Sequence, residues 1–124
     1  MSEALINKKA KYRTIIGRFT NKLNEFISVL DKCIVYPDDS LHTVIFKKYL
    51  ELSDTVKVTT YINDQGNRIK TTSYKGERKY TSNDIADIIK KPDASVSIEL
   101  IDAIKEMKDI DRMLVKMNAK RLLK

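Results

Sequence analysis

The sequence predicts a mainly α-helical domain with a central β-hairpin, an α+β protein whose N- and C-terminal helices are long and carry heptad-like seams. Near both ends of the chain, apolar residues recur in alternating steps of three and four, which is the spacing of one helix face. In the middle, apolar and polar residues alternate as in a half-buried strand. With 124 residues, three Gly and two Pro, the chain has the size of one domain and few helix breakers. We therefore expect residues 1–124 to form a single domain.

A long helix is predicted over about residues 4–35. At about 1.5 Å per residue it would span about 48 Å, which is more than a small core of the same chain can cover. Pro37 ends it, because proline lacks the amide hydrogen and disfavours helical geometry at Tyr36. The heptad-like seam predicts self-association into a homo-oligomer, as in a coiled coil. The apolar residues of this seam are Tyr12, Ile16, Phe19, Leu23, Phe26, Leu30 and Cys33.

A second, shorter helix is predicted over about residues 41–52. Asp38, Asp39 and Ser40 come just before it, and side chains of these types cap helix N-termini. The run at residues 43–45 is β-branched, so a strand is the alternative for this segment.

A β-hairpin is predicted over about residues 55–80. Residues 55–62 have the period-two pattern of a strand, and the Gly-containing segment 63–67 supplies a turn. Residues 68–74 return as the second strand. Residues 75–80 are expected to add another turn and a short third strand.

Two further helices are predicted, over about residues 83–91 and about residues 95–121. Thr81 or Ser82 can cap the first of them, and Pro92 lies at its end. The last helix carries the second heptad-like seam, which consists of Leu100, Ala103, Met107, Ile110, Leu114 and Met117.

Residues 81–107 resemble a DNA-binding helix-turn-helix, with Ala86 inside the first helix and Val96 where the second helix returns to the core. The resemblance implies that the second helix contacts DNA. Acidic residues on that helix would bring negative charge to the phosphates, so an ordinary helical hairpin is the alternative. These acidic residues are Glu99, Asp102, Glu106 and Asp109.

The formal net charge is +7, and it is unevenly distributed. Residues 1–33 carry seven basic and three acidic side chains, and residues 114–124 carry four basic and no acidic ones. If the two long helices pack antiparallel, both basic ends meet at one tip, where an anionic partner would be attracted. A solvated pair of helix ends is the alternative. The candidate nucleic-acid-binding residues of this tip are Lys8, Lys9, Lys11, Lys120 and Arg121.

The hairpin offers a second candidate nucleic-acid site. Basic side chains neutralise phosphates and aromatic rings stack on bases, so a face that combines the two suits nucleic acid. An ordinary solvent-facing strand surface, with lysines that prevent edge pairing, is the alternative. The predicted face consists of Lys57, Tyr61, Arg68, Lys70 and Tyr74, extended by Lys75, Arg78 and Lys79.

The sequence predicts neither an enzyme nor a bound cofactor. One Cys and one His exclude an internal disulfide framework and the common four-ligand zinc sites. A weak pattern of Asp38 with Glu77 and Lys79 is the only indication of a metal-dependent nuclease. Because no apolar run is long enough for a signal peptide or a membrane span, we expect a cytoplasmic protein without membrane contact, in the host cytoplasm if it is viral.

From these patterns we expect a small non-enzymatic accessory protein that self-associates and binds DNA or RNA nonspecifically through phosphate contacts. Eighteen Lys against six Arg, and fifteen Ile against ten Leu, is the usage of an AT-rich genome and fits a phage or a mobile element. The alternative is a protein–protein interaction or structural protein that binds a host or phage protein with its long helices, such as a virion component or an inhibitor of a host enzyme.

Overall fold

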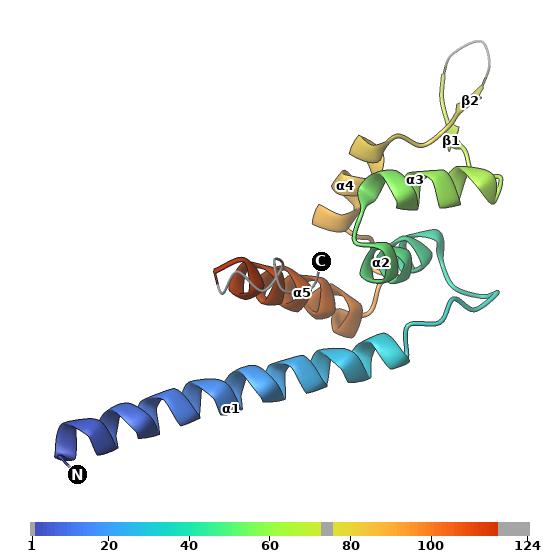
Figure 1. Ribbon diagram of the computed structural model, residues 1–124. Helices are drawn as coiled ribbons and strands as arrows, with labels where there is room; N and C mark the ends of the chain where they lie inside the picture. The colour runs from blue at the N-terminus through green and yellow to red at the C-terminus, as the bar shows by residue number, and fades with distance from the viewer. Residues whose placement is uncertain (1, 73–75, 117–124) are drawn as a thin grey trace.

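The computed structural model describes residues 2–72 and 76–116. These residues contain five helices and one two-stranded antiparallel sheet (Figure 1), which confirms the predicted fold class of mainly α with a β-hairpin. No described helix is both long and apolar enough to cross a lipid bilayer. The elements in chain order are α1 (Glu3–Asp31), α2 (Leu41–Leu52), α3 (Thr55–Asp64), β1 (Ile69–Lys70), β2 (Glu77–Arg78), α4 (Ser82–Lys90) and α5 (Ile98–Lys116).

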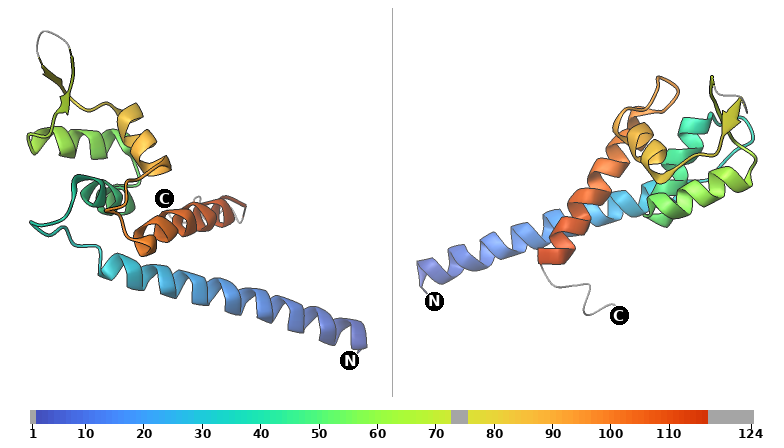
Figure 2. Two further views of the ribbon diagram at one scale, coloured as in Figure 1. Left: turned by 180° about the vertical axis from the view of Figure 1, so that it is seen from behind. Right: turned by 90° about the horizontal axis from the view of Figure 1, so that it is seen from above.

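Helices α2 to α5 pack together, and the long helix α1 is attached to them through α5. Helices α2, α3 and α4 pack on one another, α5 packs against α2, and α1 packs against α5. Helices α1 and α5 run in opposite directions, but they cross at an incline when seen from above (Figure 2). The N-terminal half of α1 therefore extends well past the described end of α5 (Figures 1 and 2).

Two clusters of buried side chains form the core. The first joins α2, α5 and the segment before α5, and contains Phe46, Leu50, Val96, Ala103, Ile104 and Met107. The second joins α2, α3 and α4, and contains Ile45, Val58, Ile62 and Ile85. Helix α1 has no buried residue and adds only partly buried side chains, such as Phe26 and Val29, to the first cluster. The folded core thus depends on the last four helices.

The strand predicted over residues 55–62 is wrong, because this segment is helix α3. Asp54 caps it, with the Asp54 carboxylate accepting hydrogen bonds from the backbone N–H groups of Val56 and Lys57. Val58 and Ile62, four residues apart, both enter the second core cluster. The β-branched residues favoured a strand, but the N-cap and burial of one helical face outweigh that weak preference.

A β-hairpin is present, as predicted, but its two strands are not the pair that was predicted to form it. Strands β1 and β2 pair with Ile69 opposite Arg78 and Lys70 opposite Glu77, so the predicted second and third strands face each other. The connection includes Gly76, which has a φ of 71°, a conformation that glycine adopts without strain. At the base of the hairpin, the Asn63 side chain exchanges two hydrogen bonds with the Tyr80 backbone, at 2.9 and 3.0 Å. This exchange fixes the hairpin to the end of α3.

The predicted helix boundaries hold best where a capping side chain defines them. Helix α2 has the predicted bounds with Ser40 as its N-cap, so the strand alternative for this segment is wrong. Thr81 caps α4. Helix α1 ends at Asp31, earlier than predicted, because the N–H groups of Lys32 and Cys33 bond three residues back and tighten the last turn. Helix α5 starts at Ile98, and its predicted end at residue 121 lies outside the described residues.

Candidate functional site

The strongest candidate for a functional surface is the N-terminal part of α1, residues 3–18, which we call the arm. Its four seam-side apolar residues leave 48 to 64 % of their surface exposed. In a helix these residues fall on the same side as the residues that α5 covers farther along α1. The arm therefore continues the apolar seam of α1 without a described covering element. The four residues are Leu5, Tyr12, Ile15 and Ile16.

The arm also carries most of the positive charge of α1. It contains five basic residues, all exposed, and Glu3 is its only acidic one. Among the described parts of the chain, none of the five forms an ion pair. The five are Lys8, Lys9, Lys11, Arg13 and Arg18. An amphipathic helix with free cations is thus presented to solvent.

The remainder of α1 shows how this seam packs when it is covered. The amino group of Lys22 lies 3.7 Å from a carboxylate oxygen of Asp109 on α5. Phe26 and Val29 pack against the first core cluster. Where α5 leaves α1, a cavity of about 300 Å³ opens, lined by Ile15, Arg18, Phe19, Lys22 and Met113.

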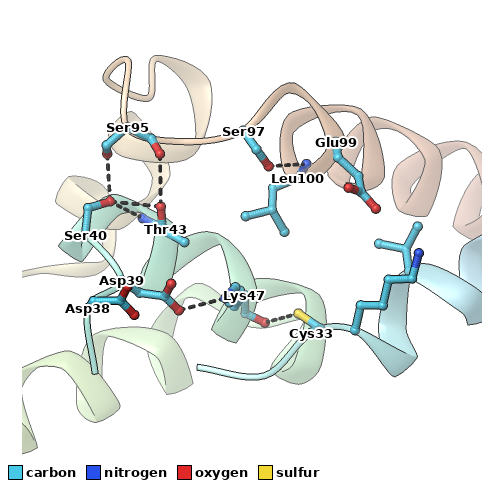
Figure 3. Close-up of a pocket in the computed structure, with 12 residues that line it drawn as sticks. Cys33, Asp38, Asp39, Ser40, Thr43, Lys47, Ser95, Ser97, Glu99 and Leu100 are labelled. Carbon is cyan, nitrogen blue, oxygen red and sulfur yellow. Dashed lines mark hydrogen bonds and ion pairs between the residues drawn. The ribbon is translucent and has the colours of Figure 1, made fainter. Parts of the chain in front are cut away.

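A second, more polar cavity of about 440 Å³ lies between the C-terminal end of α1 and the N-terminal ends of α2 and α5 (Figure 3). Ser40 on the α2 side faces Ser95 before α5, with their hydroxyl oxygens 2.7 Å apart. The Thr43 hydroxyl donates to the Ser95 carbonyl oxygen at 3.3 Å. These bonds connect α2 to the segment before α5.

An ion pair lies on the same cavity wall. The Lys47 amino group is 2.7 Å from the Asp39 carboxylate and also donates to the Ile34 carbonyl oxygen at 2.7 Å. The hydrogen bond from Lys47 lowers the pKa of Asp39. The Cys33 thiol donates to the Lys47 carbonyl oxygen, and burial raises the pKa of that thiol, which disfavours the reactive thiolate. The Asp39 and Lys47 side chains thus bind each other, and the Lys47 and Cys33 side chains bind backbone carbonyl oxygens.

The described residues do not form the predicted basic and aromatic hairpin face. Lys57 and Tyr61 lie on α3, where the Tyr61 ring sits 4.4 Å from the Lys48 amino group. Arg68 is partly buried and donates to the carbonyl oxygens of Asn63 and Asn67. The prediction fails because residues 55–62 are helical, so their side chains do not alternate between two faces.

The other predicted nucleic-acid residues that the structure describes lie in two places, the hairpin and the arm. Lys70 and Lys79 are exposed near the hairpin, whereas Arg78 is paired with Asp84. Tyr74, Lys75, Lys120 and Arg121 lie outside the described residues. Lys8, Lys9 and Lys11 lie on the arm, but the described end of α5 reaches only the neighbourhood of Ile15. The described residues therefore do not bring the two basic chain ends together.

The helix-turn-helix resemblance and the nuclease pattern receive little support from the structure. Val96 is buried between α4 and α5, as a helix-turn-helix requires, but the exposed side of α5 carries Glu99 and Asp102. For the nuclease pattern, Asp38 precedes α2 and Glu77 lies in β2. Within the described ranges, no three His, Cys, Asp or Glu side chains are grouped so that they could hold a metal ion.

Sequence reasoning did not single out Arg18, and although it expected a first helix longer than a small core can cover, it did not locate the uncovered part. The seam of α1 starts near Leu5, and the predicted helix at the C-terminus is shorter than the first one, so a part of α1 had to extend beyond it. The incline between the two helices could not be inferred from the seams, and it increases the uncovered length.

The Arg78–Asp84 pair stabilises the start of α4. Both guanidinium nitrogens bond the Asp84 carboxylate, at 2.8 and 3.1 Å, and the Thr81 backbone N–H donates to it at 2.8 Å. Thr81 and Asp84 form a capping box. The hydrogen bonds from the Arg78 guanidinium have the largest effect on the pKa of Asp84 and hold it well below its usual range.

We expect Asp84→Asn to lower the free energy of unfolding by about 1 kcal/mol at neutral pH, because it removes the charged partner of Arg78 and weakens the capping box. Because the pKa of Asp84 is lower in the folded state, its stabilisation is complete above about pH 4 and is lost as pH falls below that value. Urea unfolding of both proteins at several pH values should show their difference shrinking in acid. Asp87→Asn, an exposed change of equal charge on α4, should show no such trend. A difference that is constant with pH would contradict the role of the carboxylate.

Comparison with known proteins adds no assignment, since no model of a known family, no curated protein and no solved structure matches the chain.

Proposed function

We propose that this chain is a non-enzymatic interaction protein that uses the arm of α1 to bind a helix of another polypeptide. The observation that carries the proposal is the row of half-exposed apolar side chains from Leu5 to Ile16. The core clusters contain no residue of the arm, so the fold does not need these side chains. Apolar patches of this kind on soluble proteins mark interaction sites.

A helix is the natural ligand for this surface. From Tyr12 onward the seam repeats every three and four residues, which is the spacing that packs another helix, and Leu5 lies two turns before Tyr12 on the same face with Lys8 between them. The same face of α1 already packs a helix, α5, beyond the arm. From Leu5 to Ile16 the arm offers about 17 Å, or about three turns. A partner helix of three to four turns would cover it.

The energetics suit a reversible contact. Complete burial of a large apolar side chain contributes about 1.5–3 kcal/mol, so covering the exposed half of each seam residue contributes roughly 1 kcal/mol. Four such residues supply only a few kcal/mol in total before the cost of association. Polar contacts around the seam must add to this for a stable complex.

The polar cavity supports the non-enzymatic part of the proposal. The Asp39 and Lys47 side chains pair at 2.7 Å, and the Cys33 thiol donates to the Lys47 carbonyl oxygen at 3.4 Å. The raised pKa of the Cys33 thiol opposes a nucleophilic role. The bonds around this cavity join α2 to the segment after α1 and to the segment before α5, which is a structural task.

Selection from a displayed library of amphipathic helical peptides tests the proposal. We expect peptides that bind the wild-type chain and lose at least tenfold in affinity for an Ile16→Glu variant, because a charge would interrupt the apolar face. Thr14→Glu places the same charge on the opposite side of the exposed helix and should leave binding unchanged. If no peptide distinguishes Ile16→Glu from Thr14→Glu, the arm is not a helix-binding surface.

Nucleic acid is a second candidate ligand, favoured by the five free basic residues of the arm. With five phosphate contacts from the arm, the affinity for a labelled duplex would fall by about 500-fold between roughly 50 and 200 mM salt, and somewhat less for a single strand. In that case, Lys9→Glu combined with Arg13→Glu would weaken nucleic-acid binding, whereas Ile16→Glu would have a smaller effect. The two candidates therefore differ in whether charge or the apolar seam controls affinity.

A further inference from the structure

We propose that the helix bound by the arm is acidic, with Asp or Glu residues beside its apolar seam. This inference rests on the proposed function and names the chemistry of the partner. It follows from where the cations of the arm lie, from how α1 binds α5, and from the charge of the other surfaces that could cover the arm.

The cations border the apolar face on both sides. By helical spacing, Lys9 and Arg13 fall along one edge, Lys11 and Arg18 fall along the other, and Lys8 falls within the face. All five are exposed. A helix that covers the apolar face brings its own flanking residues next to these cations, as in the e and g positions of a coiled coil. Acidic flanking residues would gain ion pairs there, whereas basic ones would be repelled.

The packed part of α1 already shows this combination. There, α5 contributes apolar side chains to the interface, and its Asp109 lies 3.7 Å from Lys22. The pair is partly exposed, with 35 and 45 % of the two side chains accessible, so it contributes modestly to stability and mainly fixes the choice of partner. One turn farther toward the N-terminus of α1, Arg18 occupies the equivalent place with no ion-pair partner among the described residues.

The cavity at the end of this interface has the matching character. Ile15, Phe19 and Met113 give it apolar walls, and Arg18 and Lys22 give it a basic rim. Its volume of about 300 Å³ is sufficient for apolar side chains of an incoming helix. The binding seam therefore continues directly from the α1–α5 contact into the arm.

Charge disfavours two segments that could otherwise pack on the arm, namely the arm of a second copy and residues 117–124 of the same chain. A second copy of the arm would bring five basic residues and one acidic residue against an identical set. Like charges at such a contact are unfavourable. Residues 117–124, which lie outside the described part, contain three basic and no acidic residues. An acidic helix of another protein is the occupant that the charges favour.

Two synthetic peptides based on residues 98–116 test the inference, because that helix is known to pack on α1. The acidic peptide carries Lys105→Glu, Lys108→Glu and Arg112→Glu, and the basic peptide carries Glu99→Lys, Asp102→Lys and Asp109→Lys. Both keep the apolar seam, and circular dichroism checks that their helical contents match. Fluorescence anisotropy with the full chain should show the acidic peptide binding at least tenfold more tightly than the basic one at about 50 mM salt, with a smaller ratio at about 500 mM.

Charge reversal on the chain supplies the matched control. Lys8→Glu combined with Arg13→Glu should abolish the preference, because the arm then carries three basic and three acidic residues. Lys90→Glu combined with Lys91→Glu changes the net charge equally at the exposed end of α4 and should leave the preference intact. The comparison separates local pairing on the arm from the overall charge of the protein.

Three outcomes would overturn the inference. Equal affinity for both peptides would show that charge does not select the partner, while arm-dependent binders from the helical library would still support the proposed function. Binding of neither peptide would also reject it. Sedimentation that shows a dimer abolished by Ile16→Glu would identify a second copy as the occupant.

Discussion

Replacing Phe46 by alanine should lower the free energy of unfolding by about 3–5 kcal/mol, the usual cost of deleting a buried aromatic side chain. Phe46 is 1 % exposed, and it is the largest fully buried side chain in the described structure. It lies on α2 and packs in the cluster that joins α2 to α5. Since small domains are stable by about 5–15 kcal/mol, the variant should lose a large share of its stability. Urea unfolding followed by circular dichroism measures the effect.

Ile98→Ala is the control for Phe46→Ala. Ile98 opens α5 with 76 % of its surface exposed, so its truncation should change the unfolding free energy by less than about 0.5 kcal/mol. A loss below about 1 kcal/mol for Phe46→Ala would mean that α2 and α5 do not share a packed core. The packing of α5 against α1 and α2 would then lose its basis.

The elements that the sequence predicted well are those with local signals. Helix α2 follows Ser40, and α4 follows Thr81, and in both cases a hydroxyl side chain accepts a hydrogen bond from a backbone N–H three residues later. Such bonds are formed within a single turn, so a few residues determine them. Pro37 likewise set a limit for α1, although the helix ends before it.

The features that could not be predicted from the sequence are contacts between segments that are far apart in the chain. Asn63 bonds Tyr80 across 17 positions, and Lys22 meets Asp109 across two helices. Neither pairing has a signature in spacing or composition. The pairing of Arg78 with Asp84 could have been suspected, since Thr81 and Asp84 have capping-box spacing that predicts a carboxylate at this helix start.

The candidate site was predicted in part. The apolar seam of α1, including Tyr12 and Ile16, is readable from spacing, and so are the lysines around it. Spacing cannot tell which portion of a long seam the rest of the chain covers. That depends on the direction in which α5 crosses α1, and α5 also packs against α2, a contact between distant segments. Self-association and nucleic-acid binding both stay predictions, because the structure contains neither a second copy of the chain nor a nucleic acid.

Ile62→Ala should lower the free energy of unfolding by about 2–5 kcal/mol, because Ile62 on α3 is fully buried against α2 and α4. Val56→Ala should change it by less than about 0.5 kcal/mol, since Val56 is 62 % exposed and alanine is the better helix former. In a strand, Val56 and Ile62 would share one face and both truncations would be costly. Urea unfolding of the two variants thus tests whether residues 55–62 are helical in solution, and comparable losses for both would contradict α3.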